Sequence, residues 1–149
     1  LHDKLMHLGS KLVIETIQQI KVGFVETHTQ SIKDTKTAYK LNKDNCKIDW
    51  DSSIESIYNK VRGLHPYPAA WGLLSNGNEQ LNIKVYEVKK HYEEHDHQTG
   101  QLINTKKSIK VAVNEGYIEL INFKFPGKRQ MDATSFLNGF TFHENARML

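Results

Sequence analysis

The sequence contains a single cysteine, Cys46, and no long hydrophobic run. One cysteine cannot form a disulfide within the chain, which is consistent with a reducing compartment. No apolar stretch approaches the roughly 20 residues that a membrane-spanning helix needs. The N-terminus also lacks the charged and then apolar pattern of a secretory signal peptide. These absences argue against disulfide-rich secreted proteins and helical membrane proteins, and we expect a cytoplasmic protein without a membrane partner.

The sequence also lacks the short motifs of common active sites, because it has no GxSxG, no HExxH and no Gly-rich phosphate loop. His91, His95 and His97 lie among acidic residues. That segment has no apolar face and no nearby cysteine, so a solvated loop is expected there rather than a zinc site. Cys46 lies in a polar stretch, which argues against a nucleophile. We therefore expect no catalytic residue and no metal in this chain.

The chain also carries little net charge, since the formal net charge of its 149 residues is only +3. This is far below the charge of a dedicated nucleic-acid-coating protein. The lysines are nevertheless grouped between Lys33 and Lys47, around residues 106–110 and around residues 124–129. Lysine groups commonly serve solubility, so the charge pattern alone leaves nucleic-acid binding open.

Apolar residues recur every three to five positions over residues 1–20, which predicts an amphipathic helix that ends near Gly23. Residues 24–49 are polar and aperiodic, and they predict an extended, exposed linker that could not cover the apolar face of this helix. The helical pattern has already begun at Leu1. We therefore expect the chain to be a fragment of a longer protein.

A second helix is predicted to begin near Ser52 and Ser53, which with Glu55 suggest a capping box. Gly63 is the expected end of this helix. Pro66 and Pro68 follow and predict a short, extended crossover, because each proline restricts its own φ and the preceding residue. The apolar face of the predicted helix consists of Ile54, Ile57, Tyr58 and Val61.

After Trp71 the apolar period changes to two, which predicts strands. The Asn76-Gly77 pair predicts a hairpin turn. The alternation slips by one residue near Tyr86 and again near Ile121, which predicts bulges or bends of the kind that close a small barrel. Residues 99–105 predict a further strand, and a last short helix is expected to start at Asp132.

On such a barrel, basic side chains occupy outward positions of three strands and of an adjoining loop. This face would attract phosphates, although evenly spread lysines would give the same pattern. Trp50 and Trp71 are more typical of core or interface anchors than of a platform for nucleic-acid bases. The basic residues of the face are Lys84, Lys110, Lys124, Lys128 and Arg129.

Five runs of sequence follow one another along the chain in this order: LHDKLMHLG, KLNKDNCKIDW, IYNKVRGLHPYPAAW, FPGKRQM and SFLNG. Together they resemble the C-terminal half of the methionyl-tRNA formyltransferase family. The resemblance implies that residues 1–31 end a truncated catalytic domain, that residues 32–50 form a basic linker, and that residues 51–149 form an OB-like tRNA-binding domain. The expected fold is mainly β with flanking helices, built on a small OB-like barrel of five to six strands.

This family transfers a formyl group from 10-formyltetrahydrofolate to the amino group of methionine on initiator tRNA. The resemblance implies that the catalytic and folate-binding residues lie upstream of Leu1, in a catalytic domain that would partner this chain. Arg62 could equally clamp the carbonyls of the proline crossover. The positions that match tRNA-binding motifs of the family are Lys40, Lys43, Arg62, Lys128 and Arg129.

The linker departs from the family pattern at two places. Tyr39 runs directly into Lys40 where the family has an Ala-Pro-like pair, and Thr29 precedes Gln30 where Pro-Gln is common. Formyltransferases that act on sugar nucleotides or on folate carry a similar barrel, and a free-standing OB-like interaction module is a third alternative. The GKRQM and FLNG runs favour the tRNA enzyme.

Overall fold

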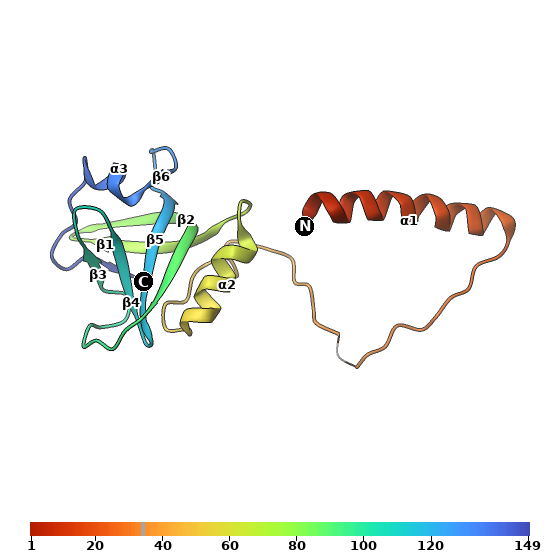
Figure 1. The fold of residues 1–149 in the computed structure, drawn as a ribbon, viewed down its shortest axis with the longest axis horizontal. Helices are drawn as coiled ribbons and strands as arrows, with labels where there is room; N and C mark the ends of the chain where they lie inside the picture. Colours follow the sequence, from red (N-terminus) through yellow and green to blue (C-terminus); the bar gives the residue numbers. More distant parts are fainter. Residues whose placement is uncertain (34) are drawn as a thin grey trace. The chain divides into compact units, whose positions relative to one another are not determined.

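The chain divides into two compact units, Leu1–Tyr39 and Lys40–Leu149 (Figure 1). The computed structural model describes residues 1–33 and 35–149, so position 34 of the predicted linker lies outside the described residues. Within those residues, none of the helices has both the length and the apolar character needed to cross a membrane.

Helix α1 (His2–Val22) is the only helix of the first unit within the described residues, and it confirms the predicted amphipathic helix. It ends at Gly23, whose φ of 75° lies in the left-handed region and whose N–H bonds back to the carbonyls of Gln19 and Ile20. No side chain of α1 is buried. Its exposed apolar residues include Leu5, Leu8, Leu12, Val13, Ile14, Ile17 and Ile20.

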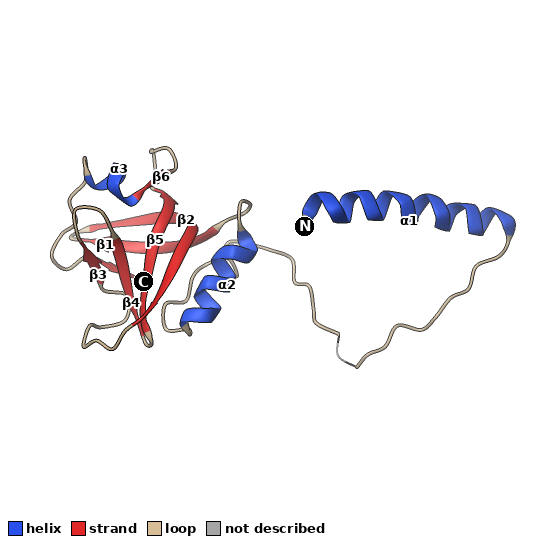
Figure 2. Cartoon of the chain, viewed as in Figure 1, coloured by secondary structure: helices blue, strands red, loops and turns tan. Residues whose placement is uncertain are grey.

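The second unit is a small antiparallel barrel (Figure 2). Six strands pair in the order β3-β4-β5-β2-β1-β7, and β6 pairs with β5. The barrel closes where the Met148 N–H donates to the Gly100 carbonyl at 2.7 Å and the Leu102 N–H donates to the Ala146 carbonyl at 3.2 Å. This confirms the predicted OB-like barrel. The strands are β1 (Ala70–Asn76), β2 (Glu79–Tyr92), β3 (Leu102–Asn104), β4 (Ile109–Val113), β5 (Gly116–Lys124), β6 (Met131–Asp132) and β7 (Arg147–Met148).

The two phase slips in the sequence coincide in space. Along the β2–β5 pair, Val85 faces Phe123 and Val88 faces Leu120, while the register shifts on both sides of Glu87. The shifts let Val85 and Val88, and likewise Leu120 and Phe123, all point into the core. The predicted irregularity therefore bends the two longest strands of the barrel at one place.

Helix α2 (Ile54–Leu64) begins where Ser53 accepts a hydrogen bond from the Ser56 N–H, as expected of an N-cap. The predicted end at Gly63 is one residue early, because the helix runs to Leu64. It stops there because the next residue, His65, precedes a proline and is extended. The buried face of α2 is Ile54, Ile57, Val61 and Leu64.

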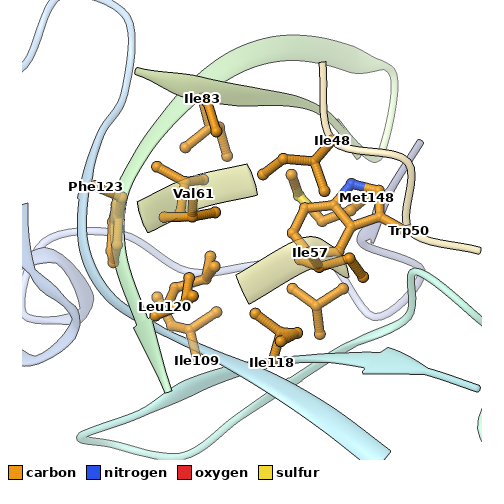
Figure 3. Packing of buried hydrophobic residues seen from close by; sticks show 14 of the residues in the cluster. Ile48, Trp50, Ile57, Val61, Ile83, Ile109, Ile118, Leu120, Phe123 and Met148 are labelled. Atoms are coloured by element: carbon orange, nitrogen blue, oxygen red, sulfur yellow. The ribbon is translucent and has the colours of Figure 1, made fainter. Parts of the chain in front are cut away.

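The segment before α2 packs on the barrel. Cys46, Ile48 and Trp50 are buried, and the expectation that residues 24–49 are exposed throughout is wrong for this part. The Ile48 N–H donates to the Trp71 carbonyl at 2.8 Å, and the Trp71 N–H donates to the Cys46 carbonyl at 3.1 Å. Figure 3 shows Ile48 and Trp50 in the core beside Met148. Residues near position 48 thus extend the barrel sheet.

Helix α3 (Ala133–Leu137) starts as predicted, because the Asp132 side chain accepts a hydrogen bond from the Ser135 N–H. Its Phe136 is buried and stacks on Phe125 with ring centroids 4.1 Å apart. This contact fixes α3 beside the turn that follows β5.

Candidate nucleic-acid interface

Four side chains form a row across the outer face of the barrel. Lys84 lies opposite Trp71 of β1 and opposite Lys124 of β5, and Trp71 is also bridged to Lys47. Residues that face each other across strands project from the same face of a sheet. With strands about 4.8 Å apart, the row spans roughly 14 Å. We call Lys47, Trp71, Lys84 and Lys124 the basic row.

Trp71 holds two lysines over its ring. The Lys43 Nζ lies 5.2 Å and the Lys47 Nζ lies 5.9 Å from the centroid of the indole. The indole N–H of Trp71 also donates to the Lys43 carbonyl at 2.7 Å. These cation–π contacts orient the two ammonium groups. Trp71 is therefore an anchor at the surface, whereas Trp50 is a core residue with 4% exposure.

The charges of the basic row and of Lys43 are not neutralised by carboxylates in residues 1–33 and 35–149. A group of uncompensated positive charges on one face gives that face a positive potential. In those residues the lysine–carboxylate ion pair is Lys90–Glu55, and the histidine–carboxylate contacts are His2–Asp3, His28–Glu26 and His91–Glu119.

Lys110 stands in a different electrostatic setting. It lies opposite Glu119 of β5, and Glu119 in turn lies opposite Lys89 of β2. The Lys110 Nζ is 5.3 Å from the ring centroid of Tyr117. Glu119 and Lys124 are five positions apart on β5, which corresponds to about 17 Å. Of the three lysines predicted to point outward, only Lys84 and Lys124 are thus brought together.

The other predicted residues are not members of the basic row. Lys128 and Arg129 are exposed in the turn after β5, and the Lys128 Nζ lies 5.9 Å from the ring of Phe136. Lys40 begins the second unit. The guanidinium of Arg62 donates to Asn59 Oδ1 at 3.0 Å within helix α2. In the described residues this side chain thus bonds within its own helix rather than to the crossover.

The profile of a family described as "Formyl transferase, C-terminal domain" matches residues 40–141, which is more than half of the chain. The chain belongs to this family. This formyl transferase C-terminal domain comprises the whole barrel except β7, together with α2 and the segment that packs before it.

Comparisons with individual relatives support the family membership. The chain is 50% identical over 149 residues to a methionyl-tRNA formyltransferase of Flavobacterium johnsoniae, covering 99% of this chain and 47% of that protein. It is 48% identical over 147 residues to that of Flavobacterium psychrophilum, covering 98% and 46%. It is 38% identical over 153 residues to that of Bacteroides thetaiotaomicron, covering 99% and 48%. The chain spans about half the length of the curated relatives it matches.

The histidine segment of this formyl transferase domain is a loop whose residues 93, 94, 96 and 97 are exposed, as expected, and it is held at His91 and His95. His91 belongs to β2 and its Nε2 lies 2.6 Å from Glu119 Oε2. The Nε2 of His95 lies 2.8 Å from the Gly116 carbonyl, and its ring is tilted against the ring of Tyr117, with the centroids 4.4 Å apart. Burial raises the pKa of Tyr117, and the nearby acidic residues raise it further. In the described chain, no group of three or more metal-ligating side chains is gathered here or elsewhere.

Lys47 and Trp71 were not among the binding residues predicted from the sequence. Lys47 enters the row only through its bridge to Trp71, a residue 24 positions later, so local pattern could not reveal it. Counting back from the hairpin turn would pair Trp71 with Lys84. That count was the available signal for placing an aromatic ring among the lysines of this domain.

Proposed function

We propose that this chain is the tRNA-binding portion of a methionyl-tRNA formyltransferase and that its basic row, with Lys43, binds the phosphate backbone of initiator methionyl-tRNA. The observation that carries the proposal is the row itself, with its lysines in register and free of carboxylate partners in the described residues. The names of the relatives supply the substrate.

Phosphate contacts suit this surface for a physical reason. Each lysine that neutralises a phosphate releases condensed counterions, and this release drives binding without reading sequence. Ordering two flexible lysines normally costs conformational entropy. Trp71 has already oriented Lys43 and Lys47 in the absence of RNA, which lowers that cost. Lys40, Arg62, Lys128 and Arg129 would extend the contact, and Lys110, which lies opposite the acidic Glu119, would add less.

The chemical step belongs to the parent enzyme in this proposal. That enzyme would transfer a formyl group from 10-formyltetrahydrofolate to the methionyl amino group in the cytoplasm. We derive no catalytic step from the described residues.

The remaining segments have roles in the same proposal. Residues 1–31 would complete the catalytic domain, and the exposed apolar face of α1 would pack against the rest of that domain. Residues 32–50 would link the catalytic domain to the barrel, and residues 51–149 would bind tRNA. The face of α1 supports this arrangement, because contiguous exposed apolar surface usually marks an interaction site.

The proposal is tested by measuring the affinity of the chain for initiator methionyl-tRNA between about 50 and 200 mM salt. The logarithm of the affinity should fall linearly with the logarithm of the salt concentration. Replacing Lys84 and Lys124 of the row by glutamine should reduce the slope by about one for each phosphate that the variant no longer neutralises. A matched double variant, Lys89→Gln with Lys110→Gln, should change the slope little. Affinity that ignores salt, or equal slopes in both variants, would contradict the proposal.

A further inference from the structure

A cavity of about 310 Å³ opens beside the basic row. We propose that it binds one unpaired nucleotide of an RNA, with the base on Tyr67 and the adjoining phosphates on Lys43 and Lys84. The proposal rests on the proposed function for the identity of the RNA, and it adds a site that reads whether a nucleotide is unpaired. The residues of the lining that matter here are Leu41, Lys43, Tyr67, Ala69, Trp71 and Lys84.

Tyr67 provides the stacking surface. Tyr67 is 86% exposed, although it lies directly between two prolines and two positions before the buried Ala69. In the described residues its ring pairs with no other aromatic ring, whereas the neighbouring Trp71 is already covered by lysines. Every nucleobase offers a π-face to such a ring, so stacking on Tyr67 needs no particular base.

The two lysines of the cavity are set to hold the charged part of a nucleotide. Lys43 is oriented by the indole of Trp71, and Lys84 lies opposite Trp71 on the neighbouring strand. The lining contains no acidic residue. An aromatic surface flanked by unpaired positive charges is the combination that proteins use to bind unstacked bases with their phosphates.

The backbone that shapes the cavity is strained. Ala69 has a φ of 72°, in the left-handed region that non-glycine residues rarely adopt. Its N–H donates to the Leu64 carbonyl at 3.0 Å, so the conformation is held by the end of helix α2. Strain of this kind persists where the surroundings impose it and is concentrated at functional sites. Ala69 sets the turn that separates the exposed Tyr67 from the first strand.

The size of the cavity limits its ligand. Its volume of about 310 Å³ lies at the lower end of the range for small-molecule pockets. A single nucleotide can enter such a space, whereas a base pair or a stacked duplex step is too large. The cavity should therefore discriminate an extruded or terminal nucleotide from the paired stem of the same RNA.

The probe for this site is a short single-stranded oligoribonucleotide with one 2-aminopurine, whose fluorescence falls when the base stacks. Addition of the full chain should quench the fluorescence, and the same strand held in a duplex should not respond. Tyr67→Ala should weaken single-strand binding roughly 5- to 150-fold, and Tyr67→Phe should retain it. Because Tyr67 is exposed, neither variant should disturb folding.

Tyr92→Ala is the matched control, since Tyr92 is also an exposed tyrosine, 60% accessible, and lies eight positions beyond Lys84 on β2. Equal quenching by the parent and by Tyr67→Ala, or an equal loss in Tyr92→Ala, would overturn the pocket while leaving the salt-dependent tRNA contact standing. Quenching through Tyr67 without any binding of tRNA would support the pocket and overturn the proposed function. Displacement of the oligonucleotide by adenosine monophosphate at equal concentration would overturn RNA as the ligand.

Discussion

Lys84 on β2 and Lys124 on β5 lie directly opposite each other, so two lysine side chains leave the outer face of the barrel at adjacent positions. Like charges in directly opposed positions of a sheet are destabilising. A few positions along the same pair of strands, Lys89 faces Glu119. In a similar strand context, the barrel therefore places one lysine opposite a like charge and another opposite an unlike charge. A phosphate bound between Lys84 and Lys124 would relieve the repulsion between them, which favours phosphate binding at this position.

Replacing Lys84 by glutamine should raise the free energy of unfolding by roughly 0.2–1 kcal/mol, because the repulsion with Lys124 disappears. The gain should shrink as salt screens the charges. Urea unfolding at low and high salt measures both effects. Lys89→Gln is the control on the same strand and should lower the free energy of unfolding, because Lys89 faces Glu119. A loss of stability in both variants would show that the repulsion does not operate.

The sequence predicted most of this fold because its longer elements carry their own periodicity. Helices α1 and α2, the hairpin at Asn76-Gly77 and the strands before and after residues 114–116 follow from local pattern alone. Strands β6 and β7 have two residues each, too few to show a period. The burial of Cys46 and Ile48 depends on pairing with Trp71, which is distant in sequence.

For the candidate site, too, local pattern predicted one part and long-range pairing decided the rest. The outward alternation of β2 correctly placed Lys84 on the surface. Strand register then decided which lysines meet, since Lys124 is brought to Lys84 while Lys110 is brought to Glu119. Register depends on the bulge beside Glu87 and on the barrel closure, and neither is encoded by the spacing of the lysines themselves.

The closure of the barrel predicts that replacing Gly100 by alanine lowers the free energy of unfolding. Gly100 has a φ of 84°, and a Cβ added there would collide with the Met148 carbonyl oxygen. Gly127 has a similar φ of 70° with nothing within 4 Å of an added Cβ. Gly127→Ala should cost roughly 1–2 kcal/mol from the left-handed backbone alone. Gly100→Ala should cost clearly more, because the strand β7 must also move.

Thermal or urea unfolding of the two alanine variants measures this difference directly. Loss of the closure should also expose the buried Met148 and weaken the pairing of β7 with β1. Equal destabilisation at Gly100 and Gly127 would mean that the close approach of the Met148 backbone contributes nothing to stability.

The contact between helix α2 and strand β2 predicts an acid-dependent contribution to stability. Lys90 and Tyr92 both donate hydrogen bonds to the Glu55 carboxylate, and together they lower the pKa of Glu55 below its ordinary 4.5. A carboxyl group with a lowered folded pKa stabilises the fold above its unfolded pKa, and this contribution is lost as the pH falls through the folded value.

Glu55→Gln should therefore lower the free energy of unfolding near neutral pH. Its difference from the parent chain should close as the pH falls from 4.5 through the lowered pKa of Glu55. The same bond raises the pKa of Lys90 above 10.5, so the difference should also close as the pH rises through that raised value. Urea unfolding across this range measures the profile. A difference that stays constant in acid would contradict the assignment to Glu55.

Because Cys46 is buried, its thiol should be protected from alkylation, whereas the thiol of an exposed linker residue would not be. Its side chain is 3% exposed, and its thiol lies 3.6 Å from Asn45 Oδ1. An alkylating reagent should therefore react with the native chain only through local or global opening, at least about 100-fold more slowly than with the urea-unfolded chain. Ile48→Ala, which removes a neighbouring core side chain, should cost about 2–5 kcal/mol and speed the labelling. Native labelling at the unfolded rate would show that residues near position 46 do not pack on the barrel.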